Sequence, residues 1–364
     1  MKIFSILECL ESFAPLTLQE DYDNAGLLIG NSQDECTGII TTLDVTEEVV
    51  EEAVKKKCNL IVSHHPIIFR GLKKLNGANY VERTVISAIK NNISVYAIHT
   101  NLDNVIEGVN KKIAEKLGLQ NLQVLQPRKN ILKKLVTFAP QKNTAEIRNA
   151  LFTVGGKLGK YSECSFNVEG IGTFKAEKGA DPYVGDIGKR HEENETRIEV
   201  IFPSYLQKQI VRALKAAHPY EEVAYDIYSL DNELNEFGSG LTGNLAQAIS
   251  AEDLLSTIKT QFKLQTIRHS PLLNKKISKI AICGGAGSFL ISSAKASGAH
   301  AFITSDVKYH EFFDSDSQIL IADIGHFESE QFTIDLLADI LKEKFCNFAV
   351  LKTEINTNPV NYYF

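Results

Sequence analysis

The chain has 364 residues, of which 44% are hydrophobic and 23% are charged, a composition typical of folded globular proteins rather than disordered ones. Lys and Arg total 39 against 45 Asp and Glu, and the formal net charge of -6 argues against nonspecific nucleic-acid binding, which needs excess basic side chains. No apolar run approaches the roughly 20 residues of a membrane span, and the six scattered cysteines form no CxxC pair, which argues against a membrane protein, a disulfide scaffold and a thiolate zinc site.

The first third of the chain alternates predicted helices and strands. Residues 1–14 have the spacing of an amphipathic helix, and charges interrupt any apolar segment of a signal peptide, so we expect a protein of the reducing cytoplasm. Beyond them we predict strands at 38–43, 59–63 and 93–98, separated by helices at 47–57 and 80–90. Strands separated by helices of this length are typical of βαβ units in a parallel sheet.

The pattern changes near Pro127. From there we predict, in order, a strand at 134–138, a helix at 144–152, a Gly-rich hairpin to 174, a strand at 196–202, a helix at 206–217 and a strand at 222–230. This β-α-β-β-α-β order matches the ferredoxin-like arrangement. The glycines from Gly238 to Gly243 are then expected to mark a domain boundary.

The α/β alternation resumes in the last third. Ser250 is a candidate N-cap for a helix to Phe262, strands follow at 277–283, 301–304 and 319–323, and one long helix is expected over about 327–344. We therefore predict the α/β class, with a core formed by residues 1–127 and 237–364 and interrupted by a ferredoxin-like inserted domain at 128–236. A tandem arrangement of domains is the alternative, but the candidate site described next connects the first and last thirds.

Metal-type ligands follow three of the predicted strands. The first segment is Ser63-His64-His65-Pro66, the second runs from His99 to Asp103, and the third runs from Asp323 to Glu330 and includes His326. In open α/β sheets, ligands bind beyond the carboxyl ends of the strands, so the three segments are expected to meet in one crevice.

The spacing within these segments suits metal binding. His326 and Glu330 are four residues apart and would share one face of a helix, while Pro66 allows the backbone to turn after the paired histidines. Imidazoles with carboxylates suit zinc, iron, manganese, cobalt or nickel, and five ligands are too many for one open tetrahedral site. They suit two metals roughly 3.5–4 Å apart. Taken singly, each segment is more readily explained by chance or by an exposed histidine than by metal binding, and only their combination favours a metal site.

Five motifs together resemble one known family, which they match over essentially the whole chain. The motifs are Tyr22 to Leu27, Ser63 to Pro66, His99 to Asp103, Thr304 to His310 and Gly325 to Glu330. They are similar to the Nif-three-like family, whose members are commonly named GTP cyclohydrolase I type 2 homologues. The inserted region, with His218-Pro219-Tyr220-Glu221-Glu222, resembles the PII/CutA-like domain of the longer bacterial members. Tyr22 stands where the family often has Trp, and Ser305 where it often has Gly.

The resemblance implies a Nif-three-like α/β core with a dinuclear metal centre. Its ligands fall on five residues of this chain, which are His64, His65, Asp103, His326 and Glu330. It also implies a homohexamer shaped as a ring, with the metal sites facing an internal cavity.

Other residues near the strand ends are candidates for supporting roles. The turn from Cys283 to Ser288 would either hold an anion on its backbone amides or simply provide a tight turn. His310 and His99 are candidate proton carriers, with a supporting position around the metals as the alternative for each. Asp23 is expected to fix a turn, and His218 is expected in a surface connection without a metal.

Two functions remain open at this point. The first is a metal-dependent hydrolase acting on a nucleotide-like or related small molecule, with Glu330, His310 and His99 as catalytic residues; opening of the GTP imidazole ring rests on the resemblance alone. The second is a noncatalytic, metal-binding regulatory or scaffold assembly in which the inserted domain senses a ligand.

Overall fold

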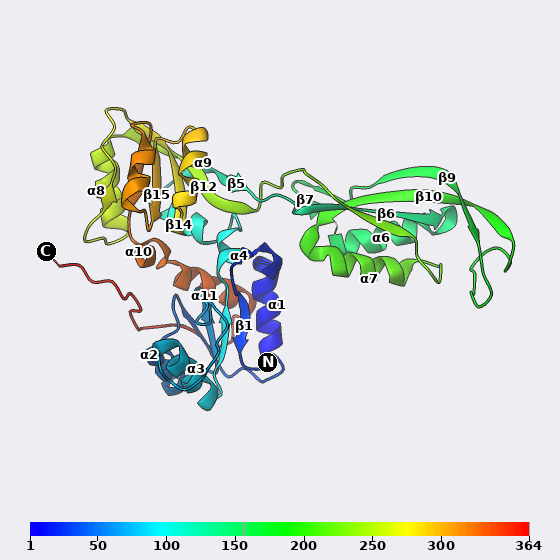
Figure 1. The fold of residues 1–364 in the computed structure, drawn as a ribbon, viewed down its shortest axis with the longest axis horizontal. Coiled ribbons are helices and arrows are strands. Elements are labelled where there is room, and N and C mark those ends of the chain that lie inside the picture. The colour runs from blue at the N-terminus through cyan, green and yellow to red at the C-terminus, as the bar shows by residue number, and fades with distance from the viewer. Residues whose placement is uncertain (156, 364) are drawn as a thin grey trace. The chain divides into compact units, whose positions relative to one another are not determined.

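The computed structural model describes residues 1–155 and 157–363. The chain divides into two compact units (Figure 1): unit 1 consists of residues 1–127 and 235–364, and unit 2 of residues 128–234. The expected mixed α/β fold is confirmed. No helix within the described ranges combines the length and the apolar character needed to cross a bilayer.

The first half of unit 1 provides four strands of a five-stranded sheet, and β17, from near the end of the chain, provides the fifth; β2, β3, β4 and β17 are parallel and β1 is antiparallel. In spatial order the strands are β1 (Gly26–Ile29), β4 (Ser94–Ala97), β3 (Leu60–Ser63), β2 (Ile39–Thr42) and β17 (Val350–Lys352). All four residues of β2, β3 and β4 are buried, because helices cover a central parallel strand on both faces.

The second half of unit 1 provides five strands of a six-stranded sheet, and β5 of the first half provides the sixth; the parallel centre is made of β14, β15 and β16. In spatial order the strands are β13 (Arg268–His269), β16 (Leu320–Asp323), β15 (Ala301–Ser305), β14 (Ile277–Ala286), β12 (Gly238–Ile249) and β5 (Gln120–Pro127). The glycines 238–243, expected at a boundary, follow the division between the units at 234/235 and lie inside β12, where Gly240 has a φ of +66° and packs against the backbone of Ile282.

Three helices of unit 1 begin at a residue whose side chain caps the first turn. The side chains of Thr46, Asn79 and Ser250 each accept a hydrogen bond from a first-turn amide of α2, α3 and α8. The helices of unit 1 are α1 (Ile3–Phe13), α2 (Glu47–Lys55), α3 (Tyr80–Lys90), α4 (Thr100–Asp103), α5 (Val109–Lys116), α8 (Ala251–Gln261), α9 (Ile291–Ala296), α10 (His326–Glu330) and α11 (Thr333–Lys344), with short 3-10 turns η1 (Leu16–Leu18), η4 (Ser288–Leu290) and η5 (Tyr309–Ser315).

The expected single helix over 327–344 is wrong, because the chain breaks after Glu330. The Gln331 side chain donates to the backbone oxygens of Glu328 and Phe262, and α11 begins only at Thr333. The break leaves α10 as a separate five-residue turn that starts and ends with a candidate ligand.

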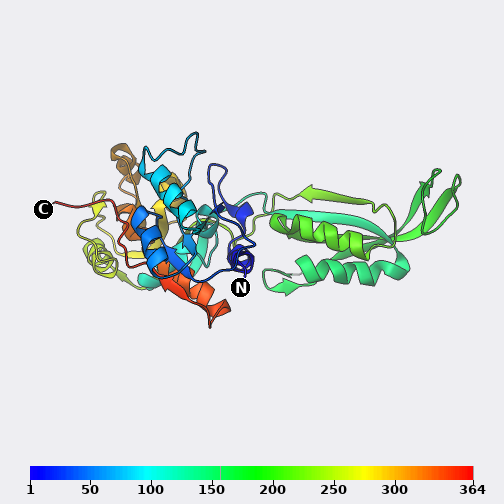
Figure 2. The same ribbon diagram turned by 90° about the horizontal axis from the view of Figure 1, so that it is seen from below.

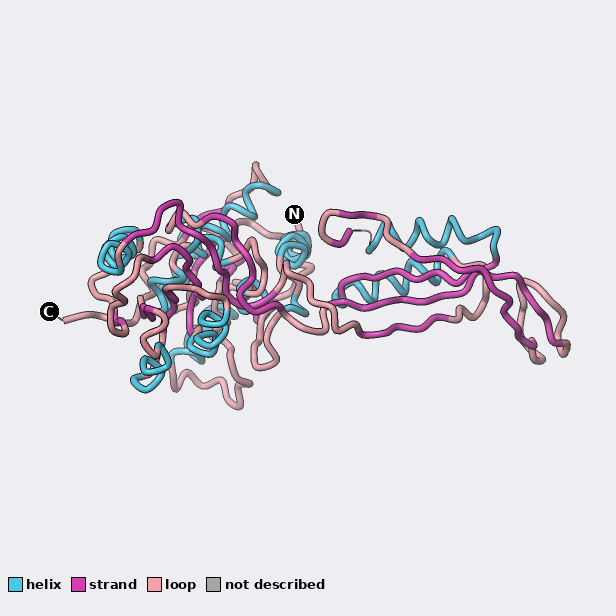
Figure 3. Tube along the Cα trace, turned by 90° about the horizontal axis from the view of Figure 1, so that it is seen from above, coloured by secondary structure: helices cyan, strands magenta, loops and turns pink. Residues whose placement is uncertain are grey.

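Unit 2 contains a four-stranded antiparallel sheet with the spatial order β11-β6-β10-β9. Both of its longer helices lie on one face of this sheet (Figure 2), and the paired strands β9 and β10 run beyond them (Figure 3). The elements are β6 (Leu132–Pro140), η2 (Gln141–Asn143), α6 (Thr144–Gly155), β7 (Lys157–Leu158), β8 (Tyr161–Ser162), β9 (Phe166–Lys175), β10 (Arg190–Pro203), η3 (Ser204–Leu206), α7 (Gln207–Ala217) and β11 (Tyr225–Ser229). The core between sheet and helices is apolar and includes Leu135, Ile147, Phe202 and Ile210.

Candidate metal centre

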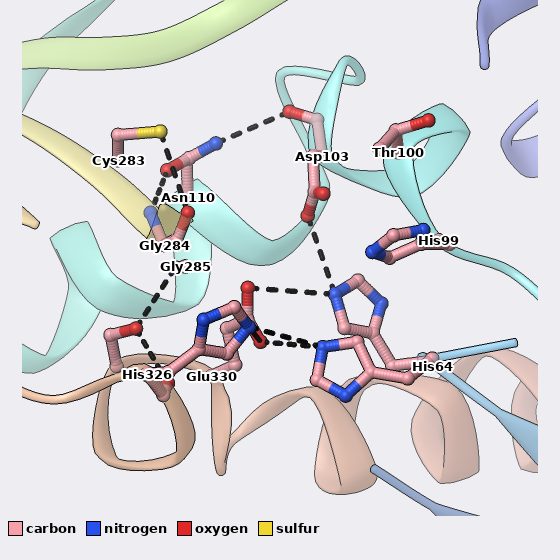
Figure 4. Close-up of polar contacts among 12 residues, drawn as sticks. His64, His99, Thr100, Asp103, Asn110, Cys283, Gly284, Gly285, His326 and Glu330 are labelled. Carbon is pink, nitrogen blue, oxygen red and sulfur yellow. Dashed lines mark hydrogen bonds and ion pairs between the residues drawn. The ribbon is translucent and has the colours of Figure 1, made fainter. Parts of the chain in front are cut away.

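The candidate ligands come together at the carboxyl ends of the parallel strands of both sheets in unit 1 (Figure 4). His64 and His65 follow β3, and Asp103 ends the short helix α4 that follows β4. His326 and Glu330 begin and end α10, which follows β16 in the other sheet. Residues far apart in the sequence thus face one another across the junction of the two sheets.

Glu330 lies at the middle of the cluster and is only 3% exposed. Its Oε2 is 3.0 Å from Nε2 of His65 and 3.2 Å from Nε2 of His326, while its Oε1 is 3.7 Å from Nε2 of His64. Nε2 of His64 is also 3.6 Å from Oδ1 of Asp103, and the Nε2 atoms of His65 and His326 are 3.3 Å apart. Three of the other four side chains, the histidines, therefore direct Nε2 at the Glu330 carboxylate.

Each histidine of the cluster is held through its Nδ1 atom, which leaves Nε2 directed inward. The Nδ1 partners are the backbone oxygen of Ile98 for His64 (2.9 Å), Asp44 for His65 (2.8 Å), Asp306 for His326 (2.6 Å) and Asp23 for His99 (2.7 Å). A carboxylate or carbonyl behind the imidazole is the arrangement that orients metal-ligating histidines.

Two buried atoms of the cluster have no hydrogen-bond partner among the described residues. They are Nε2 of His64 and Oδ1 of Asp103. A buried polar atom without a partner costs about 1–3 kcal/mol, so native structures rarely leave one without a reason. A cation beside both atoms would satisfy them, and the imidazole and carboxylate set has the chemistry of a transition-metal site. The residues present therefore fit a metal.

The electrostatics of the cluster reflect charges held close together. Burial alone would lower the pKa of His65 and of His326, but hydrogen bonds with carboxylates outweigh it and raise these values to about 10 and about 11. Burial and the charge of Glu330 raise the pKa of Asp103, and burial lowers that of His64. Burial would also raise the pKa of Glu330, but its imidazole neighbours hold it well below the usual range. Positive charge is thus favoured between the carboxylates.

Gly285 gives Glu330 the space it occupies. A Cβ at this position would lie 2.3 Å from Oε1 of Glu330, and its φ of +62° also favours glycine. Of the two alternatives for this turn, an anion site would lack two amides, because Gly284 donates to Asn110 and Gly285 donates to Ser329, each at 2.9 Å. The contribution of this turn to the cluster is the space that Gly285 leaves for the Glu330 carboxylate.

Of the other predicted residues, His99 lies beside the cluster, whereas His310 lies outside it. His99 joins His64 and His65 in a group whose ligand atoms lie within 4.8 Å of one another, and it bonds to Asp23, not Asp103. Asp23 also accepts from the amide of Asn24 and from the amide and hydroxyl of Thr100, so beyond the expected turn it connects its segment to α4. His310 is exposed on η5, where its ring contacts Tyr309 and Phe313, and the three metal-type groups of the described residues do not include it.

Sequence reasoning missed Asp44, Asn110 and Ser329. Asp44 stands two residues beyond β2, just as His65 stands two residues beyond β3, so its place at a strand end was the available signal. Asn110 bridges the amide of Gly284 and the backbone oxygen of Asp103, a role that depends on tertiary contacts.

Comparison with known proteins gives one consistent result over nearly the full length. The family model for Duf34/NIF3 (NGG1p interacting factor 3) matches residues 1–359. A Halalkalibacterium halodurans protein named GTP cyclohydrolase 1 type 2 homolog is 36% identical over 364 residues, which cover 98% of each chain. A Bacillus subtilis protein of the same name is 34% identical, covering 98% of this chain and 97% of its own. The crystal structure of a Bacillus cereus protein related to NIF3 is similar with a TM-score of 0.85 and 35% identity, covering 100% of this chain and 99% of the other.

Proposed function

The chain belongs to the Duf34/NIF3 family, and on this premise we propose that its cluster binds two divalent metal ions and hydrolyses a nucleotide-like or related small molecule. The observation that supports metal binding most strongly is the convergence of three Nε2 atoms on Glu330, with His64 and Asp103 left unsatisfied.

Two metals are proposed because the donor atoms fall into two sets that share Glu330. One set is His65, His326 and Oε2 of Glu330, and the other is His64, Asp103 and Oε1 of Glu330. A carboxylate with one oxygen toward each set can bridge two ions roughly 3.5–4 Å apart. The metal is zinc, iron, manganese, cobalt or nickel, all of which accept imidazole and carboxylate ligands.

Hydrolysis fits what such a centre and its neighbours can do. A divalent metal pair supplies Lewis acidity and makes water a stronger nucleophile near neutral pH. His99 is the first candidate to carry a proton, because Asp23 holds its Nδ1 while its ring lies 5.4 Å from that of His65, centroid to centroid. His310, four residues beyond Asp306, is the second candidate, on the substrate side.

The substrate class rests on the names of the relatives. GTP is the first compound to test, since the relatives are named as homologues of a GTP cyclohydrolase.

We also propose that residues 128–236 form an inserted ferredoxin-like domain of the PII/CutA type and that the protein assembles as a homohexamer. The sheet order β11-β6-β10-β9, with one helix after β6 and one after β10, supports the ferredoxin-like assignment.

The test compares Glu330→Gln with Glu343→Gln, which makes the same chemical change at an exposed position of α11. We expect metal-loaded wild type and Glu343→Gln to hydrolyse at least one nucleotide of a panel that includes GTP, and Glu330→Gln to lose that turnover while keeping its oligomeric size. A metal-loaded protein that hydrolyses nothing in the panel contradicts the hydrolase proposal and favours the noncatalytic regulatory function.

A further inference from the structure

Beyond β17 the chain continues without helix or strand. It contacts two carboxylates beside the candidate metal centre, those of Asp44 and Glu328. Residues 353–362, here called the strap, form the red end of the ribbon (Figure 1). Neither the proposed ligand set nor the proposed catalytic residues include any of them, so their contacts need an explanation of their own.

The strap is first fixed to the five-stranded half of unit 1. The amide of Thr353 donates to the backbone oxygen of Thr41, its hydroxyl donates to Glu52 of α2, and the amide of Glu354 donates to the same carboxylate at 2.9 Å. The Ile355 side chain packs against the core beside the sheet. The path of the strap is therefore set before it reaches the metal centre.

Thr357 then contacts the carboxylate behind His65. Its hydroxyl donates to Oδ2 of Asp44 at 2.8 Å, while Oδ1 of Asp44 bonds to Nδ1 of His65 at the same distance. Both oxygens of Asp44 are thus engaged, which fixes the rotation of this carboxylate and with it the plane of the imidazole.

The next residues of the strap contact the other side of the centre. Nδ2 of Asn358 donates to Oε1 of Glu328 at 3.1 Å, and the hydroxyl of Tyr362 lies 3.4 Å from the same oxygen. Glu328 belongs to α10, between the two ligands that this helix provides. One segment therefore connects the loop after β2 with the helix after β16.

We propose that the strap positions the metal ligands, with Thr357 holding His65 through Asp44, and Asn358 and Tyr362 holding α10. His65 and His326 come from different sheets yet have Nε2 atoms 3.3 Å apart, so a segment bonded to both sides maintains the spacing that a metal requires. Groups that orient a ligand from behind typically change metal affinity by about 10- to 100-fold. This inference rests on the proposed metal binding.

The test titrates the full chain, freed of metal, with Co²⁺ and follows the absorption of the bound ion. Thr357→Val keeps the shape of the side chain but removes the hydroxyl, and we expect roughly tenfold weaker binding. Thr357→Ser, which restores the hydroxyl, should bind as wild type does. Thr257→Val is the matched control, because it removes the same group at an exposed position of α8, where the hydroxyl donates to the backbone oxygen of Asp253 in the same helix, and it should leave the affinity unchanged.

A positioning role also predicts that the effects do not add. In an Asp44→Ala background, which removes the partner of the hydroxyl, a further Thr357→Val change should cost no additional affinity, since the hydroxyl acts through that carboxylate. Equal Co²⁺ affinity of wild type and Thr357→Val would overturn the inference, as would an equal loss in Thr257→Val. Failure of wild type itself to bind Co²⁺ would instead overturn the proposed function.

Discussion

Two buried histidines, His64 in unit 1 and His218 in unit 2, show what separates a candidate ligand from a structural residue. They are 0% and 7% exposed, and burial lowers the pKa of both. Nε2 of His218 donates to the backbone oxygen of Phe138 at 2.9 Å, and its Nδ1 accepts from the amide of Tyr220. His64 is satisfied only at Nδ1. A buried ring with an unpaired, inward-facing nitrogen is prepared for a cation, whereas a fully paired ring is part of the fold.

The same contrast extends to the surroundings of each ring. The core of unit 2 is made of aliphatic and aromatic side chains, and His218 was wrongly expected at the surface. In unit 1, acids and imidazoles are buried side by side, which is costly unless they are paired or bind an ion. The following variants and conditions distinguish a histidine that binds a metal from one that only stabilises the fold, in order of decreasing expected effect.

His326→Ala should remove most of the bound metal, because it deletes one of the donors around Oε2 of Glu330. His218→Ala should leave the metal content unchanged and destabilise the fold by about 1–3 kcal/mol, since the oxygen of Phe138 loses its donor. Metal analysis and thermal unfolding of both variants make the comparison. Retention of full metal content by His326→Ala would contradict its role as a ligand.

Gly285→Ala should weaken metal binding severely, because the new methyl group would collide with Oε1 of Glu330. Gly298→Ala controls for backbone strain, since that glycine also has a positive φ (+75°) but nothing within 4 Å of a Cβ. We expect at least a tenfold loss of Co²⁺ affinity in the first variant and none in the second. Equal affinities in the two would show that the shape of this turn does not matter to the centre.

Metal affinity should fall as the pH is lowered. His65 and His326 have pKa values raised to about 10 and about 11 by the carboxylates beside them, so below these values each must release a proton to bind a metal. His64, with a lowered pKa, is already neutral near pH 7 and releases none. Apparent affinity should drop by up to about tenfold per pH unit for each proton released. Calorimetric titrations in buffers of different ionisation enthalpy count these protons, and a pH-independent affinity would argue against both imidazoles as ligands.

Removal of unit 2 should change the metal content least. Pro127 pairs with Gly238 across β5 and β12, so the chain leaves and re-enters unit 1 on neighbouring strands and a short linker can replace residues 128–234. We expect this shortened chain to keep the metal content of wild type. Loss of folded, metal-binding protein would contradict the proposal that the insertion is a separate domain.

The sequence predicts those parts of the molecule that depend on local pattern. The range of α3 was predicted to the residue, and strands β2, β3, β14, β15 and β16 appear where apolar runs were noted, because buried parallel strands have a continuous apolar signal. Ligand-type residues at the ends of β3, β4 and β16 could be identified for the same reason.

Features that arise from tertiary contacts could not be predicted in this way. Asp44 supports His65 only because two strands end in register, and the contact of Gly285 with Glu330 joins β14 to α10. The break between α10 and α11 depends on a side-chain bond from Gln331 to Phe262 in a distant helix end. None of these relations leaves a periodic signal in the sequence.

Anomalous X-ray scattering from crystals of the metal-loaded protein tests the central claim most directly. We predict two peaks per chain roughly 3.5–4 Å apart, one beside His65 and His326 and the other beside His64 and Asp103, with Glu330 between them. Crystals grown with metal that show no peak at these five residues, or a peak only elsewhere, would contradict the account.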